Sequence, residues 1–522
     1  MIFRSPHGEV AIPAQSLTDF VLGADHGDPQ RVAFADAITG RVVTYGELRE
    51  KVRRTAAGLA ASGIRKGDVI ALCCPNSAEF AIAFHAGARI GATITTANPA
   101  NTPKDLAWQL KDAGAKMLIA SPALLDKARA ASNESGLAPE LISTDAVPGL
   151  RSLASIEIDA DPPPVSVDPH TDVVALPYSS GTTGLPKGVM LTHRNLVANL
   201  AQIENLDGRR VRTLLGLLPF FHVYGLMVIL NHGLRMGATI VTLPRFEPEL
   251  FLKALQDWHV ELAHIVPPIA VALAKHPTVG NYDLQHLGEL FSGAAPLGAD
   301  LTEAVQQRLH VPIKQGYGMT ETSPVTHYSD SRSELRQGTV GRLVPSTECR
   351  LVDVDSGHDL ESGKSGEVWI RGPQVMKGYL NNAEATARTV DAEGWLHTGD
   401  IGTIDSDGYL TIVDRLKELI KVKGYQVAPA ELEALLLKHP RIADAAVIPV
   451  MDVECGEVPK ALVVARGELT AAEVIEFVHA RVAHYKRLHQ VGFVDAIPKS
   501  ASGKILRRVL IARERELSRN AT

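Results

Sequence analysis

Apolar positions along the first 170 residues follow two alternating periods, one typical of strands and one typical of helices. A continuous apolar run at 68–73 precedes a helical pattern at 77–90, and a second apolar run follows at 92–95. Strand patterns that alternate with helical ones favour an α/β fold around a parallel sheet. We therefore predict that the chain begins with α/β structure.

The same order of elements occurs twice along the chain. Residues 88–95 (Ala-Arg-Ile-Gly-Ala-Thr-Ile-Thr) match residues 234–241 (Leu-Arg-Met-Gly-Ala-Thr-Ile-Val). A proline, an amphipathic helix pattern and a short apolar strand pattern follow each copy. We predict two α/β subdomains related by duplication, at about 50–170 and 190–330, with a ligand cleft between them.

The pattern changes after about residue 339. Short β-like segments separated by Gly and Asp turns predict a small β-barrel or β-subdomain, and a mixed pattern with a strong helix at 429–438 follows it. We place a domain boundary near Lys417. The prediction is an N-terminal domain of residues 1–416 and a smaller α+β C-terminal domain of residues 417–522.

The composition is that of an ordinary globular protein, with 45% hydrophobic and 21% charged residues over 522 positions. The net charge is −6 and Lys and Arg form no block, so we expect no nucleic-acid partner. The four cysteines have no metal or disulfide spacing, and we expect neither a signal peptide nor an integral membrane segment. These features favour a cytoplasmic protein.

Hydroxyls, glycines and one lysine gather in residues 178–188 (Tyr-Ser-Ser-Gly-Thr-Thr-Gly-Leu-Pro-Lys-Gly), between a strand pattern and a helical pattern. Glycines free backbone N–H groups to face an anion, hydroxyls add donors and lysine adds charge. Lys187 lies between Pro186 and Gly188, so the spacing is not that of a Walker A loop. The segment predicts a loop that wraps phosphates, although a plain polar surface loop has the same composition.

Three further segments carry groups suited to a nucleotide or an acid. Tyr317 lies between two glycines and can pack against a purine, and the nearby Glu321 can hold a hard cation such as Mg²⁺. Asp400 and Arg415 offer an acceptor and a fork of donors for ribose hydroxyls. His222 lies in an apolar, aromatic stretch. Each has an ordinary alternative: a satisfied core histidine, a helix-start acid or a surface charge.

These segments, in this order, resemble the motifs of the adenylate-forming superfamily of acyl-CoA synthetases, coumarate–CoA ligases, beetle luciferases and peptide-synthetase adenylation domains. Residues 418–433 and residues 498–508 (Pro-Lys-Ser-Ala-Ser-Gly-Lys-Ile-Leu-Arg-Arg) extend the resemblance over nearly the whole chain. The best match is to coumarate–CoA ligase-like enzymes. The resemblance implies the α/β fold predicted above, with a mobile C-terminal domain that acts as a lid.

The resemblance also implies a role for particular positions. The ATP and AMP site would contain Ser179, Ser180, Gly181, Thr182, Thr183, Gly184, Lys187, Gly293, Ala294, Ala295, Gln315, Gly316, Tyr317, Gly318, Thr320, Asp400 and Arg415. Glu321 and Thr183 would bind Mg²⁺. The acyl pocket would be lined by Tyr224, Val228, Gly293, Gly318, Pro324 and Val325.

The implied reaction has two halves. A carboxylic acid attacks the α-phosphorus of ATP and releases pyrophosphate, and the thiol of coenzyme A then attacks the acyl-AMP and releases AMP. The implied catalytic residues are Lys504, His222, Lys421 and Gln426. Lys504 would serve the first half; after rotation about the hinge Lys417, the loop from Lys421 to Gln426 would serve the second. Lys423 and Gly424 would contact coenzyme A.

The resemblance favours 4-coumarate or a related hydroxycinnamate as the acid. Val228 stands where plant coumarate–CoA ligases have a serine, Trp369 where they have a cysteine, and Thr322-Ser323 where they have Ala-Gly. A more apolar pocket floor leaves a medium-chain fatty acid open. A luciferase-like oxygenase and a carrier-protein-loading enzyme share these motifs and remain alternative classes. We further expect a bacterial enzyme that is a monomer or a homodimer.

Overall fold

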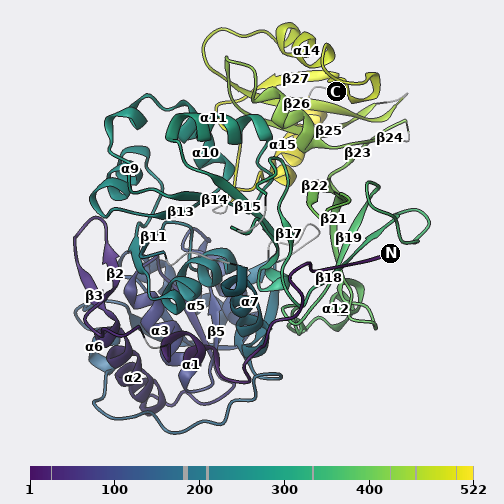
Figure 1. Cartoon of the computed structure of the whole chain (residues 1–522). Helices are drawn as coiled ribbons and strands as arrows, with labels where there is room; N and C mark the ends of the chain where they lie inside the picture. The colour runs from purple at the N-terminus through teal and green to yellow at the C-terminus, as the bar shows by residue number, and fades with distance from the viewer. Residues whose placement is uncertain are drawn as a thin grey trace.

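A computed structural model describes residues 1–24, 26–179, 186–206, 211–331, 334–423, 425–452, 455–500 and 503–520. Six of the predicted site residues lie outside these ranges: Ser180, Gly181, Thr182, Thr183, Gly184 and Gly424. The described residues form a large N-terminal domain with three sheets and a smaller C-terminal domain with a fourth (Figure 1).

The first sheet has eight strands, in the order β20-β10-β8-β5-β4-β6-β7 with β9 paired to β10. Its strands are β4 (Val69–Cys73), β5 (Thr93–Thr96), β6 (Ala115–Ala120), β7 (Glu140–Ser143), β8 (Val173–Ala175), β9 (Tyr178–Ser179), β10 (Lys187–Thr192) and β20 (Gly378–Tyr379). Strands β4 to β8 run parallel. Strands β9 and β10 flank the predicted phosphate loop in the chain.

The second sheet has nine strands, in the order β17-β16-β15-β14-β13-β11-β12-β2-β3. Its strands are β2 (Val32–Asp36), β3 (Val42–Thr44), β11 (Thr213–Gly216), β12 (Thr239–Thr242), β13 (Leu262–Ile265), β14 (Glu289–Ser292), β15 (Ile313–Gly318), β16 (Val325–Tyr328) and β17 (Arg342–Leu343). The neighbour order β5-β4-β6-β7 in the first sheet recurs here as β12-β11-β13-β14. The predicted duplication is therefore visible as a shared strand order.

Helices cover both sheets, and most of them pack into one continuous apolar core that includes Ile94 of one sheet and Ile240 of the other. The helices are α1 (Leu17–Leu22), α2 (Tyr45–Ala61), α3 (Ala78–Arg89), α4 (Pro103–Ala113), α5 (Leu125–Ser135), α6 (Leu153–Ile156), α7 (His193–Leu206), α8 (His232–Met236), α9 (Pro248–Asp257), α10 (Pro267–Lys275) and α11 (Ala299–Leu309). Helices α4 and α5 pack in a separate cluster with Leu118. The hydroxyl of Thr44 accepts from Glu47 N, and the Glu47 carboxylate accepts from Thr44 N. This capping box explains why α2 begins there and stabilises it by about 1 kcal/mol.

The third sheet is antiparallel and has five strands: β1 (Ile2–Arg4), β18 (Glu348–Val352), β19 (Ser365–Arg371), β21 (Leu396–Ile404) and β22 (Leu410–Arg415). The short helix α12 (Ala383–Thr389) lies between β20 and β21 in the chain. This sheet is the β-subdomain predicted from the short β-like segments. Its last hairpin, β21–β22, leads directly to the C-terminal domain.

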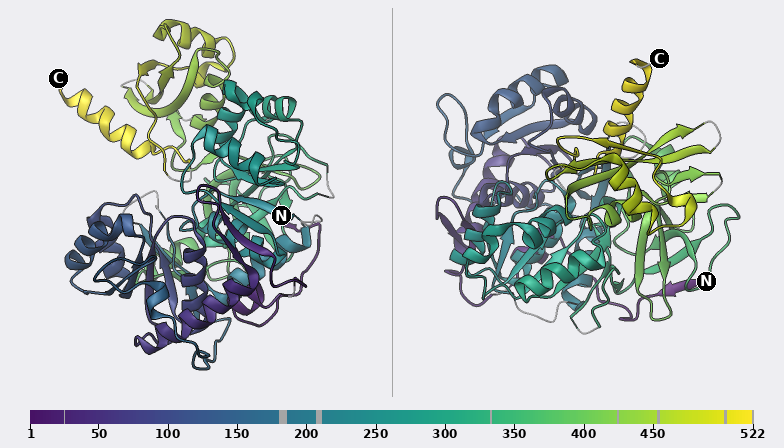
Figure 2. Two further views of the ribbon diagram at one scale, coloured as in Figure 1. Left: turned by 90° about the vertical axis from the view of Figure 1, so that its left-hand side faces the viewer. Right: turned by 90° about the horizontal axis from the view of Figure 1, so that it is seen from above.

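The C-terminal domain has its own sheet and its own core. The strands are β23 (Ile420–Val422), β24 (Tyr425–Val427), β25 (Ile442–Asp452), β26 (Gly456–Ala465) and β27 (Gln490–Phe493), and the helices are α13 (Pro429–Leu436), α14 (Ala471–His479) and α15 (Arg507–Asn520). Its core residues, such as Leu432 and Val463, belong to a cluster separate from the main core. Figures 1 and 2 show this domain seated over one end of the N-terminal domain, beside α10 and α11, with α15 projecting outwards.

Candidate active site

Several of the predicted site residues lie at or after the carboxyl ends of parallel strands in the second sheet. His222 follows β11, Gly293 follows β14, and Tyr317 and Glu321 lie at and beyond the end of β15. Parallel strands carry their carboxyl ends to one edge, which is where α/β proteins bind ligands. The hairpin β21–β22 adds Asp400 and Arg415, which are paired across the hairpin.

Asp400 is held between an aromatic hydroxyl and a guanidinium. The hydroxyl of Tyr317 donates to Asp400 Oδ2 at 2.5 Å, and Arg415 Nε lies 3.4 Å from Oδ1. The Asp400 side chain is buried, with 7% exposed. Burial, followed by the negative charge of Asp400, raises the pKa of Tyr317 well above its usual range. The phenol therefore stays a donor and keeps the carboxylate oriented.

Glu321 is the buried carboxylate of the site, with 6% exposed. The hydroxyl of Tyr379 donates to Glu321 Oε1 at 2.8 Å, and Lys187 Nζ lies 4.6 Å from the centroid of the Tyr379 ring. Tyr379 therefore joins the lysine of the phosphate loop to the predicted metal ligand. Sequence reasoning missed Tyr379, because no spacing rule relates it to Glu321.

His222 is neutral at physiological pH. Burial, and to a lesser extent the positive charge of Lys504, lower its pKa to about 3. Its Nδ1 accepts a hydrogen bond from Tyr224 N at 3.3 Å. A neutral imidazole that accepts at Nδ1 carries its proton on Nε2. His222 therefore has an N–H donor to offer to an anion in the site.

Lys504 reaches the site from the C-terminal domain. Burial lowers its pKa, and the positive charge of Arg415 lowers the pKa further. The negative charges of Asp400, Glu321 and Glu418 oppose this shift. The lysine thus shares the site with the residues predicted to bind ribose, metal and acid.

The turn before Lys504 depends on Gly503. Its φ is +79°, a conformation that suits glycine. A Cβ at this position would lie 3.1 Å from Val266 Cγ2, at the start of α10. Ser500 Oγ also accepts from Lys504 N at 3.1 Å. A tight turn against the N-terminal domain thereby sets the position of the lysine.

Five of the six predicted acyl-pocket residues are buried, and Gly318 is half-buried. Tyr224 and Val228 lie in a buried π-helix, η2 (Tyr224–Asn231), where the sequence indicated only an apolar core segment. A Cβ on Gly293 would lie 2.8 Å from Tyr224 Cε1, so the absent side chain leaves room for the ring. Pro324 and Val325 are buried as well. A Cβ on Gly318 would lie 1.9 Å from Pro324 O, so only glycine allows this approach.

His264, which sequence reasoning did not single out, contacts the predicted acyl-pocket residue Tyr224. Its Nδ1 lies 3.2 Å from the Tyr224 hydroxyl, and its ring packs against Phe291 with centroids 5.6 Å apart. Burial lowers the pKa of His264 to about 3, so the ring is neutral. Its one available signal was a histidine inside an otherwise apolar strand pattern at 262–266. The side chains around Tyr224 are therefore aromatic and uncharged.

The residues predicted for the second half-reaction do not join this site. Lys421 and Gln426 are exposed cross-strand partners in the β23–β24 hairpin, which projects from the edge of the C-terminal domain (Figure 1). Lys423 is exposed on the same hairpin, and Lys417 is exposed between β22 and β23. The described orientation therefore assembles Lys504, and not Lys421 or Gln426, with the nucleotide residues.

The remaining predicted nucleotide residues surround the same edge. Ala294 and Ala295 follow Gly293 and are half-buried, and Gln315 is buried with its amide bonded to the backbone of Leu297. Gly316 and Thr320 are half-buried within and just after β15. Ser179 is half-buried at the end of β9, where the described part of the phosphate loop stops.

Fold and site together define an adenylate-forming enzyme, and the chain belongs to the family of AMP-binding enzymes. The family profile described as AMP-binding enzyme matches residues 24–380, and that of the AMP-binding enzyme C-terminal domain matches residues 431–504. The predicted superfamily is thereby confirmed.

Within this family the chain is similar to plant coumarate–CoA ligases. It is 45% identical to 4-coumarate–CoA ligase 5 of Oryza sativa subsp. japonica, over 98% of this chain and 97% of the relative. It is 44% identical to 4-coumarate–CoA ligase 2 of Nicotiana tabacum, over the same shares of both chains.

Solved structures agree on the fold. ATP-bound MatB from Rhodopseudomonas palustris superposes with a TM-score of 0.87 and 29% identity, covering 96% of this chain and 100% of MatB. The anthranilate CoA ligase AuaEII in complex with anthranoyl-AMP gives a TM-score of 0.88 and 25% identity, with coverage of 96% and 97%. In the described part of the chain, every helix is too short or too polar to cross a membrane.

Proposed function

We propose that this protein is an AMP-forming acid–CoA ligase. ATP and a carboxylic acid give acyl-AMP and pyrophosphate, and acyl-AMP and coenzyme A then give acyl-CoA and AMP. One observation carries the proposal: the buried ammonium of Lys504 lies in one site with His222, Glu321 and Asp400. A cation between a carboxylate and an α-phosphate offsets the repulsion of two anions that must meet.

Each half of the site has its own part in adenylation. Asp400 and Arg415 bind the ribose, and Tyr317 packs against the adenine opposite Gly293 and the two alanines that follow. Lys187, Thr320 and the hydroxyls of the phosphate loop bind the phosphates. The Tyr317–Asp400 hydrogen bond supports these roles, because it fixes one carboxylate oxygen and leaves the other to ribose and Arg415.

The acid would be oriented by His222 and Lys504. The Nε2–H of neutral His222 donates to one carboxylate oxygen, and the Lys504 ammonium attracts the other and aims it at the α-phosphorus. A neutral histidine suits this site better than a charged one. A second cation beside Lys504 would lower the pKa of Lys504 and make its ammonium easier to deprotonate.

Mg²⁺ fits the residues present at Glu321. Hard cations take oxygen ligands, and the Glu321 carboxylate has one oxygen held by Tyr379 and one left for a ligand. Thr183 is the second proposed ligand and lies outside the described residues. When bound, the ion would neutralise charge on the pyrophosphate leaving group.

The second half-reaction would use a second orientation of the C-terminal domain. We propose that residues 417–522 rotate about Lys417 relative to residues 1–416. This rotation would withdraw Lys504 and bring Lys421 and Gln426 to the acyl-AMP, with Lys423 and Gly424 against coenzyme A. Lys421, Lys423 and Gln426 are exposed on the β23–β24 hairpin, and this supports a role in contacting acyl-AMP and coenzyme A after the rotation.

The acid would be a 4-coumarate-like hydroxycinnamate. Tyr224, His264 and Phe291 form an aromatic, uncharged wall that suits a flat ring and disfavours a second carboxylate. The names of the plant relatives point to the same class. The predictions of a bacterial source, a cytoplasmic location and a monomer or homodimer stay predictions.

Pyrophosphate release tests the proposal across a panel of acids, each with ATP and Mg²⁺ and with or without coenzyme A. We expect release with cinnamate-type acids, and AMP plus a thioester only when coenzyme A is present. Turnover with fatty acids alone would move the acyl pocket to the medium-chain class. No release with any acid would refute the ligase.

A further inference from the structure

Helix α13 of the C-terminal domain begins without a cap of its own. Its N-cap residue is Ala428, which has no side chain able to accept a hydrogen bond. Instead, Ala430 N donates at 2.9 Å to Asp414 Oδ2, which belongs to β22 of the N-terminal domain. A carboxylate at a helix N-terminus satisfies a free N–H group and complements the helix dipole.

The other end of α13 also meets the N-terminal domain. Lys275, the last residue of α10, donates from Nζ to Leu437 O at 3.2 Å. The next residue, Lys438, forms an ion pair with Asp300 at the start of α11. A cation at a helix C-terminus is favourable for the same electrostatic reason. Opposite charges of one domain thus hold the two ends of a helix of the other.

The middle of α13 lies close to the start of α11. A Cβ built on Gly298, the N-cap of α11, would lie 4.0 Å from Ala434 Cβ in α13. Both residues are exposed, and Gly298 has an extended backbone (φ −65°, ψ 150°) that any residue can adopt. The N-terminal domain therefore lies close to α13 at its start, its middle and its end. Figure 1 shows the C-terminal domain beside α10 and α11.

A buried ion pair connects α13 to the catalytic lysine. Glu433 of α13 accepts from Arg507 Nη2 at 2.7 Å, and Arg507 lies three residues after Lys504. Arg507 Nη1 also donates to Glu418 at 2.6 Å. The position of α13 on the N-terminal domain is thereby transmitted to the segment that carries Lys504.

We propose that Asp414 and Lys275 are positioning residues for adenylation: they hold α13 at its two ends and so place Lys504 in the site. Both contacts cross the domain boundary, so both must break before the C-terminal domain can turn to the thioester-forming orientation. This inference rests on the proposed ligase function. Neither residue is assigned to contact substrate.

Lys275 is the cleaner of the two to test. Asp414 Oδ1 also accepts from Arg415 N at 2.7 Å, so a change at Asp414 would disturb the ribose site as well. Lys275 is exposed at the end of a surface helix. Lys253 offers a matched control, since it is an exposed lysine of α9 that pairs with Asp257 of the same helix.

We expect Lys275→Met to slow pyrophosphate release about 2- to 10-fold, the effect of losing one hydrogen bond that favours this orientation. Thioester formation from supplied acyl-AMP should keep its rate, Lys275→Arg should restore adenylation, and Lys253→Met should change neither half. Equal loss in both half-reactions, or no loss in either, would contradict the positioning role.

A reversible cross-link tests the same helix directly. Cysteines in place of Gly298 and Ala434 would have Cβ atoms about as far apart as in a disulfide, where the distance is about 3.5–4.5 Å. The oxidised double variant should form acyl-AMP in a single turnover at the rate of the reduced protein. Its thioester formation should fall more than about 10-fold and return on reduction.

The single-cysteine variants, treated with the same oxidant, should behave like the unmodified protein. Full thioester formation by the cross-linked protein would overturn the proposal, and so would failure of the two cysteines to link or loss of acyl-AMP formation on linking. Failure of the ligase proposal itself would be recognised separately, because the unmodified protein would then release no pyrophosphate with any acid.

Discussion

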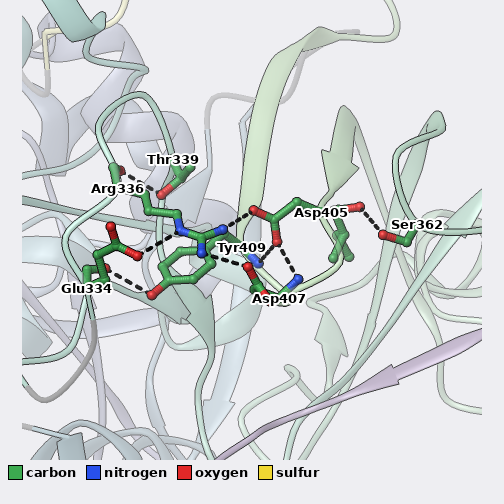
Figure 3. Close-up of polar contacts among 8 residues, drawn as sticks. Glu334, Arg336, Thr339, Ser362, Asp405, Asp407 and Tyr409 are labelled. Carbon is green, nitrogen blue, oxygen red and sulfur yellow. Dashed lines mark hydrogen bonds and ion pairs between the residues drawn. The ribbon is translucent and has the colours of Figure 1, made fainter.

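Two arginines of this protein each gather carboxylates, one at the surface of the N-terminal domain and one inside the junction between the domains. Arg336 reaches Asp405 at 2.8 Å and Asp407 at 2.6 Å and lies 4.4 Å above the Tyr409 ring (Figure 3). Arg507 reaches Glu418 and Glu433 at nearly the same distances. The bond lengths alone do not distinguish the two clusters.

Their surroundings differ. The Arg336 side chain is 33% exposed and that of Arg507 is 12% exposed. Near Arg507, burial raises the pKa of Asp414, and it raises the pKa of Glu433 to about 7. The three nearby carboxylates in turn raise the pKa of Arg507. One buried arginine shared among three carboxylates does not fully offset the free-energy cost of burying their charges. Water screens the charges of the Arg336 cluster.

The two clusters differ in whether they lie next to the boundary between the domains. The Arg336 cluster connects the turn between β21 and β22 to the loop between β16 and β17. Tyr409 of the turn also donates from its hydroxyl to Glu334 O of the loop at 2.9 Å. These contacts lie within the N-terminal domain, so a rotation of the C-terminal domain would leave them intact. The Arg507 cluster lies between the hinge, α13 and the segment of Lys504, where small free-energy changes can alter the orientation.

The largest loss of stability is expected from Arg507→Met. The change leaves the buried Glu433 and the half-buried Glu418 without their cation, which costs about 3–5 kcal/mol. We expect a much lower melting temperature and loss of adenylation, measured by thermal unfolding and pyrophosphate release. A variant as stable and active as the unmodified protein would show that the two arginine clusters are equivalent.

Lys504→Ala should cost adenylation about 10²- to 10³-fold, the effect of removing one donor aimed at developing charge. Thioester formation from supplied acyl-AMP should be nearly unchanged, because that step uses the other orientation. Lys499→Ala is a matched control, since Lys499 lies nearby in the chain but pairs with Asp444. An equal loss in both half-reactions with Lys504→Ala would mean that the lysine acts in only one fixed orientation.

Glu433 predicts a pH dependence of stability with a definite sign. Its pKa rises from 4.5 to about 7 in the folded state, so the folded protein holds this proton more tightly than the unfolded chain. The contribution of Glu433 to the free energy of unfolding should therefore fall as the pH rises from 4.5 to about 7, by on the order of 3 kcal/mol. Buried histidines such as His222 and His264, whose pKa values are lowered to about 3, contribute a slope of the opposite sign, so the Glu433 contribution is measured as a difference between variants.

Unfolding scans of the unmodified protein and of Glu433→Gln should differ in free energy by an amount that falls as the pH rises across this range. Glu431→Gln, a change on the same helix at an exposed position, should leave the slope as it is. A difference between the two proteins that rises with pH would mean that the ion pair with Arg507 outweighs burial.

The smallest effect is expected from Arg336→Met. An exposed ion pair contributes roughly 0–1 kcal/mol, so the melting temperature should change by only a few degrees and both half-reactions should be unchanged. This variant is also the control for Arg507→Met, because the substitution is the same. A loss as large as that of Arg507→Met would remove the distinction drawn from burial.

The sequence by itself determined the architecture and much of the chemistry. Alternating apolar periods and the repeated octamer predicted two α/β halves, and the strand orders agree because periodicity reflects which face of each element is buried. Asp400 and Arg415 were expected together, and a short hairpin pairs them because neighbours in sequence become neighbours in a hairpin.

Only the tertiary structure decided which distant groups share hydrogen bonds. Tyr379 with Glu321, His264 with Tyr224 and Asp414 with Ala430 each join elements far apart in the chain. Such contacts leave no periodic or spacing signal. The motif around Lys504 predicted its role in catalysis. The motif does not indicate which orientation of the C-terminal domain the structure adopts. In the described structure Lys504, rather than Lys421, shares the site with the nucleotide residues, and we propose that the cross-domain contacts at the two ends of α13 favour this orientation.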